Sequence, residues 1–132
     1  MLKHWYDELE QKYIHLFETD KEGKPVRGIE CGVGWARHVE DFLKSLEWQR
    51  THNGGPHEIK IFQIKEKFGQ ARCYVTYPDK VGYGVETALG AFEGKCSITC
   101  EKCGELQYDC IKNINGWVYC LCSNCMPPKE AA

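Results

Sequence analysis

The sequence predicts an α+β protein with two N-terminal helices, a β-hairpin, a third short helix and a C-terminal cysteine-rich unit. Three observations support this class: helical spacing of apolar residues in the first third, a central stretch rich in β-branched and aromatic residues, and two Cys-x-x-Cys pairs near the end. The expected division is an α+β domain over 1–97, the cysteine-rich unit over 98–127, and a tail over 128–132 that we expect to be disordered.

The helices are expected at about 2–18, 33–50 and 83–97. In the first two, apolar residues recur every three or four positions, and in the second the charged residues lie mostly on the opposite face. The third is weaker, because several glycines interrupt it and each lowers helix stability. The polar stretch over 19–28 contains both glycine and proline and therefore predicts a loop.

The β-hairpin is expected over 58–77, with strands on either side of the turn sequence KEKFG. The alternation in its first strand changes phase. Ile59 and Ile61 would lie on one face, whereas Phe62 and Ile64 would lie on the other. Such a change of phase predicts either a β-bulge or a strand that is buried on both faces.

Composition and charge narrow the class of protein. The 132 residues are 42% hydrophobic and 27% charged with a net charge of −2, which is typical of a globular chain and gives no general attraction to nucleic acid. No apolar run approaches the roughly 20 residues of a membrane helix, and the charged start lacks signal-peptide features. We therefore expect a cytoplasmic protein without a membrane partner. In that compartment the nine cysteines favour metal ligation over disulfides.

The cysteine spacing C-x2-C-x18-C-x2-C is typical of a four-cysteine zinc site. Two sulfurs three residues apart can meet on one ion, and two such pairs complete a tetrahedron. Asn115-Gly116 between the pairs is a strong hairpin signal, so the unit over 98–127 is predicted to be a zinc ribbon or treble clef. The predicted ligands of one structural Zn²⁺ are Cys100, Cys103, Cys122 and Cys125. Four protein ligands leave no open position, so we expect no catalytic role for the ion.

Other uses of the sulfur are weaker alternatives. Disulfides, a thioredoxin-like redox pair and an iron–sulfur cluster each fit the compartment or the surrounding pattern less well. The ligand set could also include Cys96 or Cys110, and Cys120 could replace Cys122. Otherwise these three, like Cys31 and Cys73, are interpreted as small buried residues. Cys31 with His38 is only a weak candidate for a thiol nucleophile.

Two surfaces are candidates for binding. The hairpin combines basic and aromatic side chains, a mixture that suits a single-stranded nucleic acid, in Lys60, Lys65, Lys67, Phe68, Arg72 and Tyr74. A hairpin with one buried face and one solvated lysine face would show the same pattern, and this explanation is favoured. Trp48 lies away from the apolar stripe of its helix and is a candidate contact for a protein partner, as is the charged loop over 18–31.

A family resemblance rests on the order of several motifs: GW, an amphipathic helix, IFQIKEKFGQARCYV, CEKCG and GWVYCLCSNC. Over residues 33–125 the chain resembles small proteins encoded by bacteriophages and prophages, whose hairpin reads VKEKFGGLRFY and whose end reads CxxCG and GWxxxLCxxC. The family is largely uncharacterised and is not known as an enzyme. The resemblance implies an accessory protein in the cytoplasm of a bacterial host.

The leading functional hypothesis is therefore a non-catalytic zinc-binding protein that binds and modulates or inhibits a host protein machine. A bacterial defence system is one candidate target, which would make the protein anti-CRISPR-like. The alternative hypothesis is a nucleic-acid-binding zinc ribbon protein that uses the hairpin over 60–74. The sequence indicates no oligomeric state.

Overall fold

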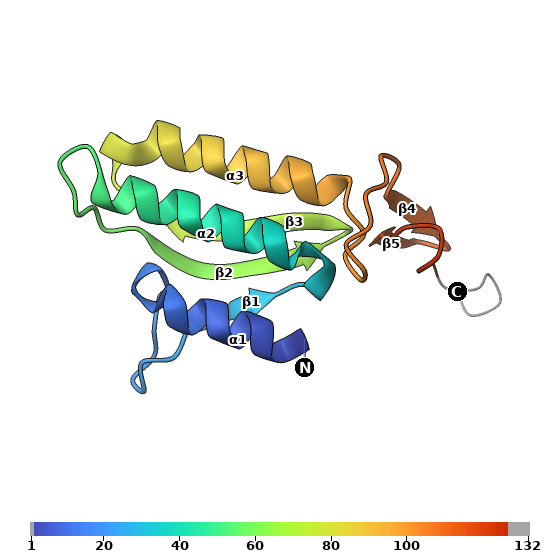
Figure 1. The fold of residues 1–132 in the computed structure, drawn as a ribbon, viewed down its shortest axis with the longest axis horizontal. Helices are drawn as coiled ribbons and strands as arrows, with labels where there is room; N and C mark the ends of the chain where they lie inside the picture. The colour runs from blue at the N-terminus through green and yellow to red at the C-terminus, as the bar shows by residue number, and fades with distance from the viewer. Residues whose placement is uncertain (1, 127–132) are drawn as a thin grey trace.

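The computed structural model describes residues 2–126, so the tail predicted to be disordered lies outside the described residues. The fold is mixed α+β (Figure 1). Its helices are α1 (Leu2–Lys12), α2 (Ala36–Thr51) and α3 (Gly82–Ser97). Its strands are β1 (Gly28–Glu30), β2 (Lys60–Lys67), β3 (Gln70–Thr76), β4 (Ile111–Ile114) and β5 (Trp117–Cys120). Short 3-10 turns are η1 (Ile14–Leu16), η2 (Val33–Trp35) and η3 (Asp79–Val81).

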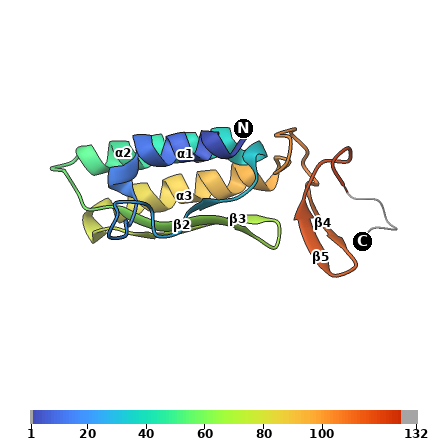
Figure 2. The same ribbon diagram turned by 90° about the horizontal axis from the view of Figure 1, so that it is seen from below.

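The first three strands form a mixed sheet in the order β1-β2-β3, with β1 parallel and β3 antiparallel to β2. All three helices lie on the same side of this sheet, as Figure 2 shows. In the part of the chain that the structure describes, no helix covers the opposite face. Strands β4 and β5 form a separate antiparallel pair beyond the tip of the β2–β3 hairpin. Within residues 2–126, the longest helices are too short or too polar to cross a bilayer.

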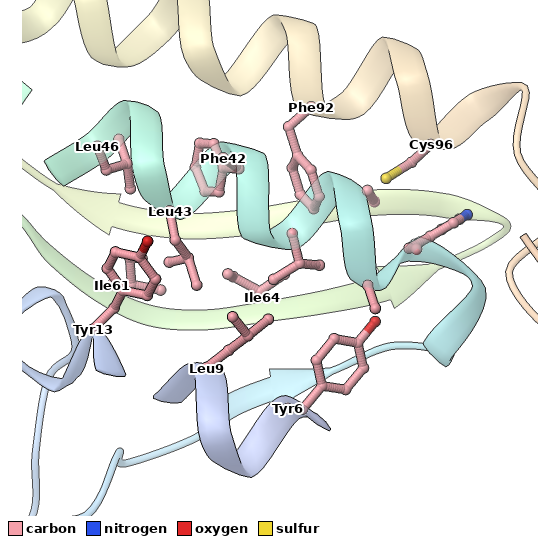
Figure 3. Packing of buried hydrophobic residues seen from close by; sticks show 14 of the residues in the cluster. Tyr6, Leu9, Tyr13, Phe42, Leu43, Leu46, Ile61, Ile64, Phe92 and Cys96 are labelled. Atoms are coloured by element: carbon pink, nitrogen blue, oxygen red, sulfur yellow. The ribbon is translucent and has the colours of Figure 1, made fainter. Parts of the chain in front are cut away.

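The core lies between the helices and the inner face of the sheet (Figure 3). Leu9 from α1, Leu43 from α2 and Ile64 from β2 are all buried there. The rings of Phe42 and Phe92 stack with centroids 4.8 Å apart and join α2 to α3. The same buried cluster continues through Cys96, Cys100, Cys110, Cys120 and Cys122, so the cysteine-rich unit shares the core of the preceding domain.

The N-terminal region differs from the sequence prediction in two ways. The first helix ends at Lys12 instead of 18, and the 3-10 turn η1 continues the chain to Leu16. The loop expected between the helices also contains a strand, β1, which pairs with β2. Three residues are too few to show a periodic pattern. Ile29 gains its strand conformation from β2 on one side and from the Glu10 carboxylate, which accepts its N–H at 2.8 Å, on the other.

The predicted β-bulge is confirmed in β2. The register with β3 shifts between Ile61 and Gln63, and Phe62 is the extra residue. The shift allows Ile59, Ile61 and Ile64 all to be buried, while 44% of Phe62 remains exposed. The alternative, burial on both faces, applies at one point of the strand, since Gln63 on the outer face is only 6% exposed and the adjacent Ile64 on the inner face is fully buried.

A substitution of Trp35 tests how much the contact between the core and the cysteine-rich unit contributes to stability. Trp35 is fully buried, and its Nε1 donates to the Thr99 carbonyl at 2.7 Å. Trp35→Phe removes this donor and leaves a void, so we expect the free energy of unfolding to fall by about 1–3 kcal/mol. Urea denaturation measures the change.

Trp48→Phe is the matched control, because Trp48 is 49% exposed. A change below about 0.5 kcal/mol is expected there. Equal losses in the two variants would contradict the assigned role of Trp35.

Candidate metal centre

The structure brings together the four cysteines that the spacing singles out. One sulfur each from Cys100, Cys103, Cys122 and Cys125 lies within 4.8 Å of the others. The Sγ atoms of Cys103 and Cys122 are 3.6 Å apart. A tetrahedral ion with metal–sulfur bonds of about 2.3 Å requires sulfurs about 3.8 Å apart, so the group fits a single ion.

The local backbone explains why the sulfurs converge. After the first pair the chain reverses at Gly104, which has a φ of +85° and whose N–H donates to the Cys100 carbonyl at 2.9 Å. The second pair is closed by the bond from Cys125 N–H to the Cys122 carbonyl. Between them, β4 and β5 form the predicted hairpin, with Asn115 and Gly116 both at positive φ.

The electrostatics of the group also favour a cation. Burial raises the pKa of the Cys100 thiol, but backbone N–H groups of Cys122, Cys103 and Lys102 outweigh burial and lower this pKa to about 6. By contrast, a hydrogen bond to Cys122 is the main cause that raises the pKa of Cys125 to about 12. Thiolates this close repel one another, so the full set ionises only when a cation offsets their charge.

The neighbouring thiols point elsewhere. The Cys120 Sγ lies 3.2 Å from the Thr99 carbonyl and 3.3 Å from the Cys96 carbonyl, and it donates to the backbone. Burial raises the pKa of Cys96, Cys110 and Cys120 and keeps them neutral. All three are completely buried beside the candidate ligands, where they act as small core residues.

Two glycines form a seat for the first cysteine turn. Gly34 N–H donates to the Glu101 carbonyl at 2.6 Å, and Gly32 N–H donates to the Glu101 carboxylate at 2.7 Å. A Cβ at position 34 would lie 2.2 Å from the Cys100 carbonyl oxygen, and one at position 32 would lie 2.4 Å from the Glu101 side chain. The sequence Gly-Val-Gly thus lets two backbone segments pack directly on each other, a role that sequence reasoning missed.

A second contact joins the cysteine-rich unit to the tip of the β2–β3 hairpin. A Cβ at Gly69, which has a φ of +77°, would lie 3.1 Å from the Tyr119 carbonyl on β5. Beside this contact is a cleft of about 610 Å³, lined by Glu66, Lys67, Phe68, Glu101, Gly116, Trp117, Val118 and Tyr119. Sequence reasoning missed this cleft as well, because its walls come from segments about 50 residues apart.

The aromatic side chains at the mouth of the cleft are unusually exposed. Phe68 is 64% exposed and Trp117 is 69% exposed. Phe68 also has a φ of +54°, a left-handed conformation that is rare for a large residue without a local polar side chain. The turn therefore holds the Phe68 ring in solvent at a conformational cost.

The predicted nucleic-acid residues do not converge on the metal group. Lys60, Lys65 and Lys67 lie on β2, and Arg72 and Tyr74 lie on β3, while Phe68 is in the turn between the strands. Strand register places the five strand residues on the outer face of the sheet, away from the helices.

Trp48, the predicted partner contact, is 49% exposed on α2, with its ring stacked on His52 at 4.1 Å. Its role in binding stays a prediction. The pairing of Cys31 with His38 gains no support from the geometry. Burial raises the pKa of Cys31 to about 12, and the His38 Nε2 is engaged with Thr99 Oγ1 at 3.0 Å. A neutral thiol without a base beside it is a poor nucleophile.

Comparisons with known proteins return no match. No protein-family model matches the chain, and neither the curated proteins nor the solved structures contain a significant match.

Metal content tests the assigned group. We expect one metal ion per chain, and Cys103→Ser should remove it because a hydroxyl replaces a thiolate ligand. Cys110→Ala is the matched control, since its sulfur is buried beside the group but is not part of it. Atomic emission spectrometry of the purified variants measures the molar ratio of metal to protein. Metal retained in Cys103→Ser, or lost equally in both, would contradict the assignment.

The glycine seat gives a separate prediction. Gly34→Ala places a methyl group against the Cys100 backbone, and we expect it to cost about 3 kcal/mol and to weaken metal retention. Gly90→Ala in α3 is the control, because nothing lies within 4 Å of its added Cβ and alanine favours the helix by about 1 kcal/mol. Thermal unfolding compares them. A Gly34→Ala protein as stable as Gly90→Ala would contradict the close packing of Gly34 on the Cys100 backbone.

Proposed function

We propose that this chain is a non-catalytic zinc protein whose four-cysteine centre holds a docking cleft for a protein of the bacterial host. The observation that carries the proposal is the cleft of about 610 Å³ between the β2–β3 tip and the β4–β5 hairpin, with exposed Phe68 and Trp117 beside it. Aromatic side chains held in solvent next to a concave surface are typical of protein-binding hot spots.

Zinc is the ion that this ligand chemistry favours. Four thiolates in a tetrahedron select zinc among the common intracellular divalent cations, and iron is the main competitor. A complete set of protein ligands leaves no position for water or substrate, which supports a structural role and not an enzymatic one. Binding of the ion would contribute folding free energy to a unit that is too short to form a core of its own.

The charges around the cleft favour a protein over a nucleic acid as the occupant. Glu66 and Glu101 line it together with Lys67, and the two carboxylates would repel phosphates. Burial raises the pKa of Glu101, so its environment is already poor in water. An apolar side chain flanked by a basic residue on the partner would complement these walls.

The biological setting rests on the resemblance of residues 33–125 to phage-encoded proteins. It supports a site of action in the cytoplasm of a bacterial host, where the bound protein would be modulated or inhibited. A defence system is the target that best suits such an inhibitor, in the manner of an anti-CRISPR protein.

Affinity capture from bacterial lysate tests the proposal. Trp117→Ala removes an exposed ring from the cleft without touching the buried core, so we expect the captured host protein to fall by at least about tenfold, as at other hot spots. Quantitative mass spectrometry measures the loss, and metal content verifies that the unit is intact.

Trp5→Ala is the matched control, because Trp5 is 46% exposed on α1, far from the cleft in sequence. Capture should be unchanged in this variant. A host protein that binds the Trp117→Ala variant as well as the unaltered chain would contradict the docking role of the cleft. Turnover in a substrate screen would overturn the non-catalytic role.

A further inference from the structure

The outer face of the β1-β2-β3 sheet is a second surface, which shares only Lys67 with the proposed docking cleft. Figure 2 shows the helices on the other side of the sheet. Directly opposed residues of paired strands share a face, so the register alone defines this surface. Its accessible members are Glu30 from β1, then Lys60, Lys65 and Lys67 from β2, and Gln70, Arg72, Tyr74 and Thr76 from β3, whereas Gln63 at the centre of this face is only 6% exposed.

The charge of this face is opposite to that of the whole chain. Three lysines and Arg72 stand against one carboxylate, Glu30, whereas the chain carries a net charge of −2. Glu30 is already engaged, since it accepts a hydrogen bond from Gln63 and pairs with Arg27 at 3.4 Å. A positive surface on an acidic protein marks a local site for an anionic partner.

The cations are largely free to meet that partner. Among the described residues, Lys65 and Lys67 form no ion pair, and the Lys67 ammonium lies 5.7 Å from the Phe68 ring. Arg72 donates from Nη2 to Gln70 at 2.7 Å, while its buried Nε has no partner within the described part of the chain. Lys60 is also partly used, through its bond to the His15 carbonyl at 3.0 Å.

Two aromatic rings accompany the cations. Tyr74 is 46% exposed in the middle of β3, opposite Gln63, and Phe62 is 44% exposed next to Gln63 on β2. The β-bulge makes this possible, because it leaves Phe62 out of the core while its neighbours Ile61 and Ile64 remain buried. Without the bulge, Phe62 and Ile64 would share one face of the strand.

Exposed rings and free cations on one open sheet are the features that bind a single-stranded nucleic acid. Bases stack on the aromatic faces, and the phosphates between them pair with lysine and arginine. A duplex hides its bases within its stack, so the rings would add little to its binding. We propose that the outer face of this sheet binds single-stranded DNA or RNA, with Tyr74 as the stacking residue and Lys65 and Arg72 as phosphate contacts.

Fluorescence anisotropy with labelled oligo(dT) and oligo(rU) tests the proposal on the full zinc-loaded chain. Binding at low salt should weaken as salt is added, with a slope of log K against log salt of about −2 to −3 for three to four phosphates. A hairpin duplex of matched length should bind at least about tenfold more weakly.

The variant is Tyr74→Ala combined with Lys65→Gln, which removes one ring and one cation from the face. We expect at least a tenfold loss of oligonucleotide affinity, since stacking of one base alone contributes about that much. The matched control is Tyr83→Ala combined with Lys44→Gln, which makes the same chemical and charge change at exposed positions on α3 and α2. Circular dichroism and metal content establish that both variants are folded.

Several results would overturn the inference. These are no binding to either oligonucleotide at low salt, equal affinity for the duplex, or equal losses in the variant and its control. A Tyr74→Ala, Lys65→Gln protein that keeps the oligonucleotide but loses a captured protein would assign the face to a protein partner. Binding that survives in this variant but fails in Trp117→Ala would place the nucleic acid in the cleft.

Discussion

The backbone of the first cysteine turn lies directly on the backbone of residues 32–35, and the arrangement of the C-terminal unit depends on this contact. Two N–H groups, from Gly32 and Gly34, are both satisfied by Glu101, which lies between the two cysteines of the first pair. Trp35 adds a bond to the Thr99 carbonyl one residue before that pair. Because no side chain separates Gly34 from the backbone of Cys100 and Glu101, the position of Cys100 is fixed by the core of the preceding domain.

This contact explains how a metal ion could stabilise more than its own ligands. The ion would join the first cysteine turn to the second, and the second follows β5 directly in the chain. β5 in turn lies against Gly69 at the tip of the β2–β3 hairpin. The cysteine-rich unit therefore contacts the preceding domain at two places, Gly34 and Gly69. The cleft that Phe68 and Trp117 line lies beside the second contact. Binding of an ion to the four cysteines would therefore help to hold the two walls of the cleft in place.

Much of this fold follows from short-range patterns in the sequence. The second and third helices, the β2–β3 hairpin with its bulge, and the Asn115-Gly116 turn all have a local cause in spacing or turn chemistry. The four candidate ligands are equally local, since each pair sits three residues apart. Here the sequence is sufficient because the interactions that determine these features lie within a few residues of each other.

The features that the sequence did not predict depend on contacts between distant segments. The strand β1 is defined by pairing with β2 and by Glu10, neither of which is near it in the chain. The role of Gly32 and Gly34 is to have no side chain where residue 101 approaches, and a missing side chain leaves no periodic pattern. The end of α1 at Lys12 is similar: apolar residues continue at helical spacing to Phe17, but they pack on the core through η1 and the Phe17–Ile61 bridge.

The two binding surfaces proposed for this chain differ in what holds them together. The outer sheet face is built by β1, β2 and β3, whose inner face is fixed by the apolar contacts of all three helices. The cleft has only one wall from that sheet, and its other wall comes from β5 and the residues around the metal group. The tip of the β2–β3 hairpin belongs to both, because Lys67 and Phe68 lie where the face ends and the cleft begins. Loss of the metal would thus free one wall of the cleft and leave the sheet in place, so metal occupancy would govern one surface without governing the other.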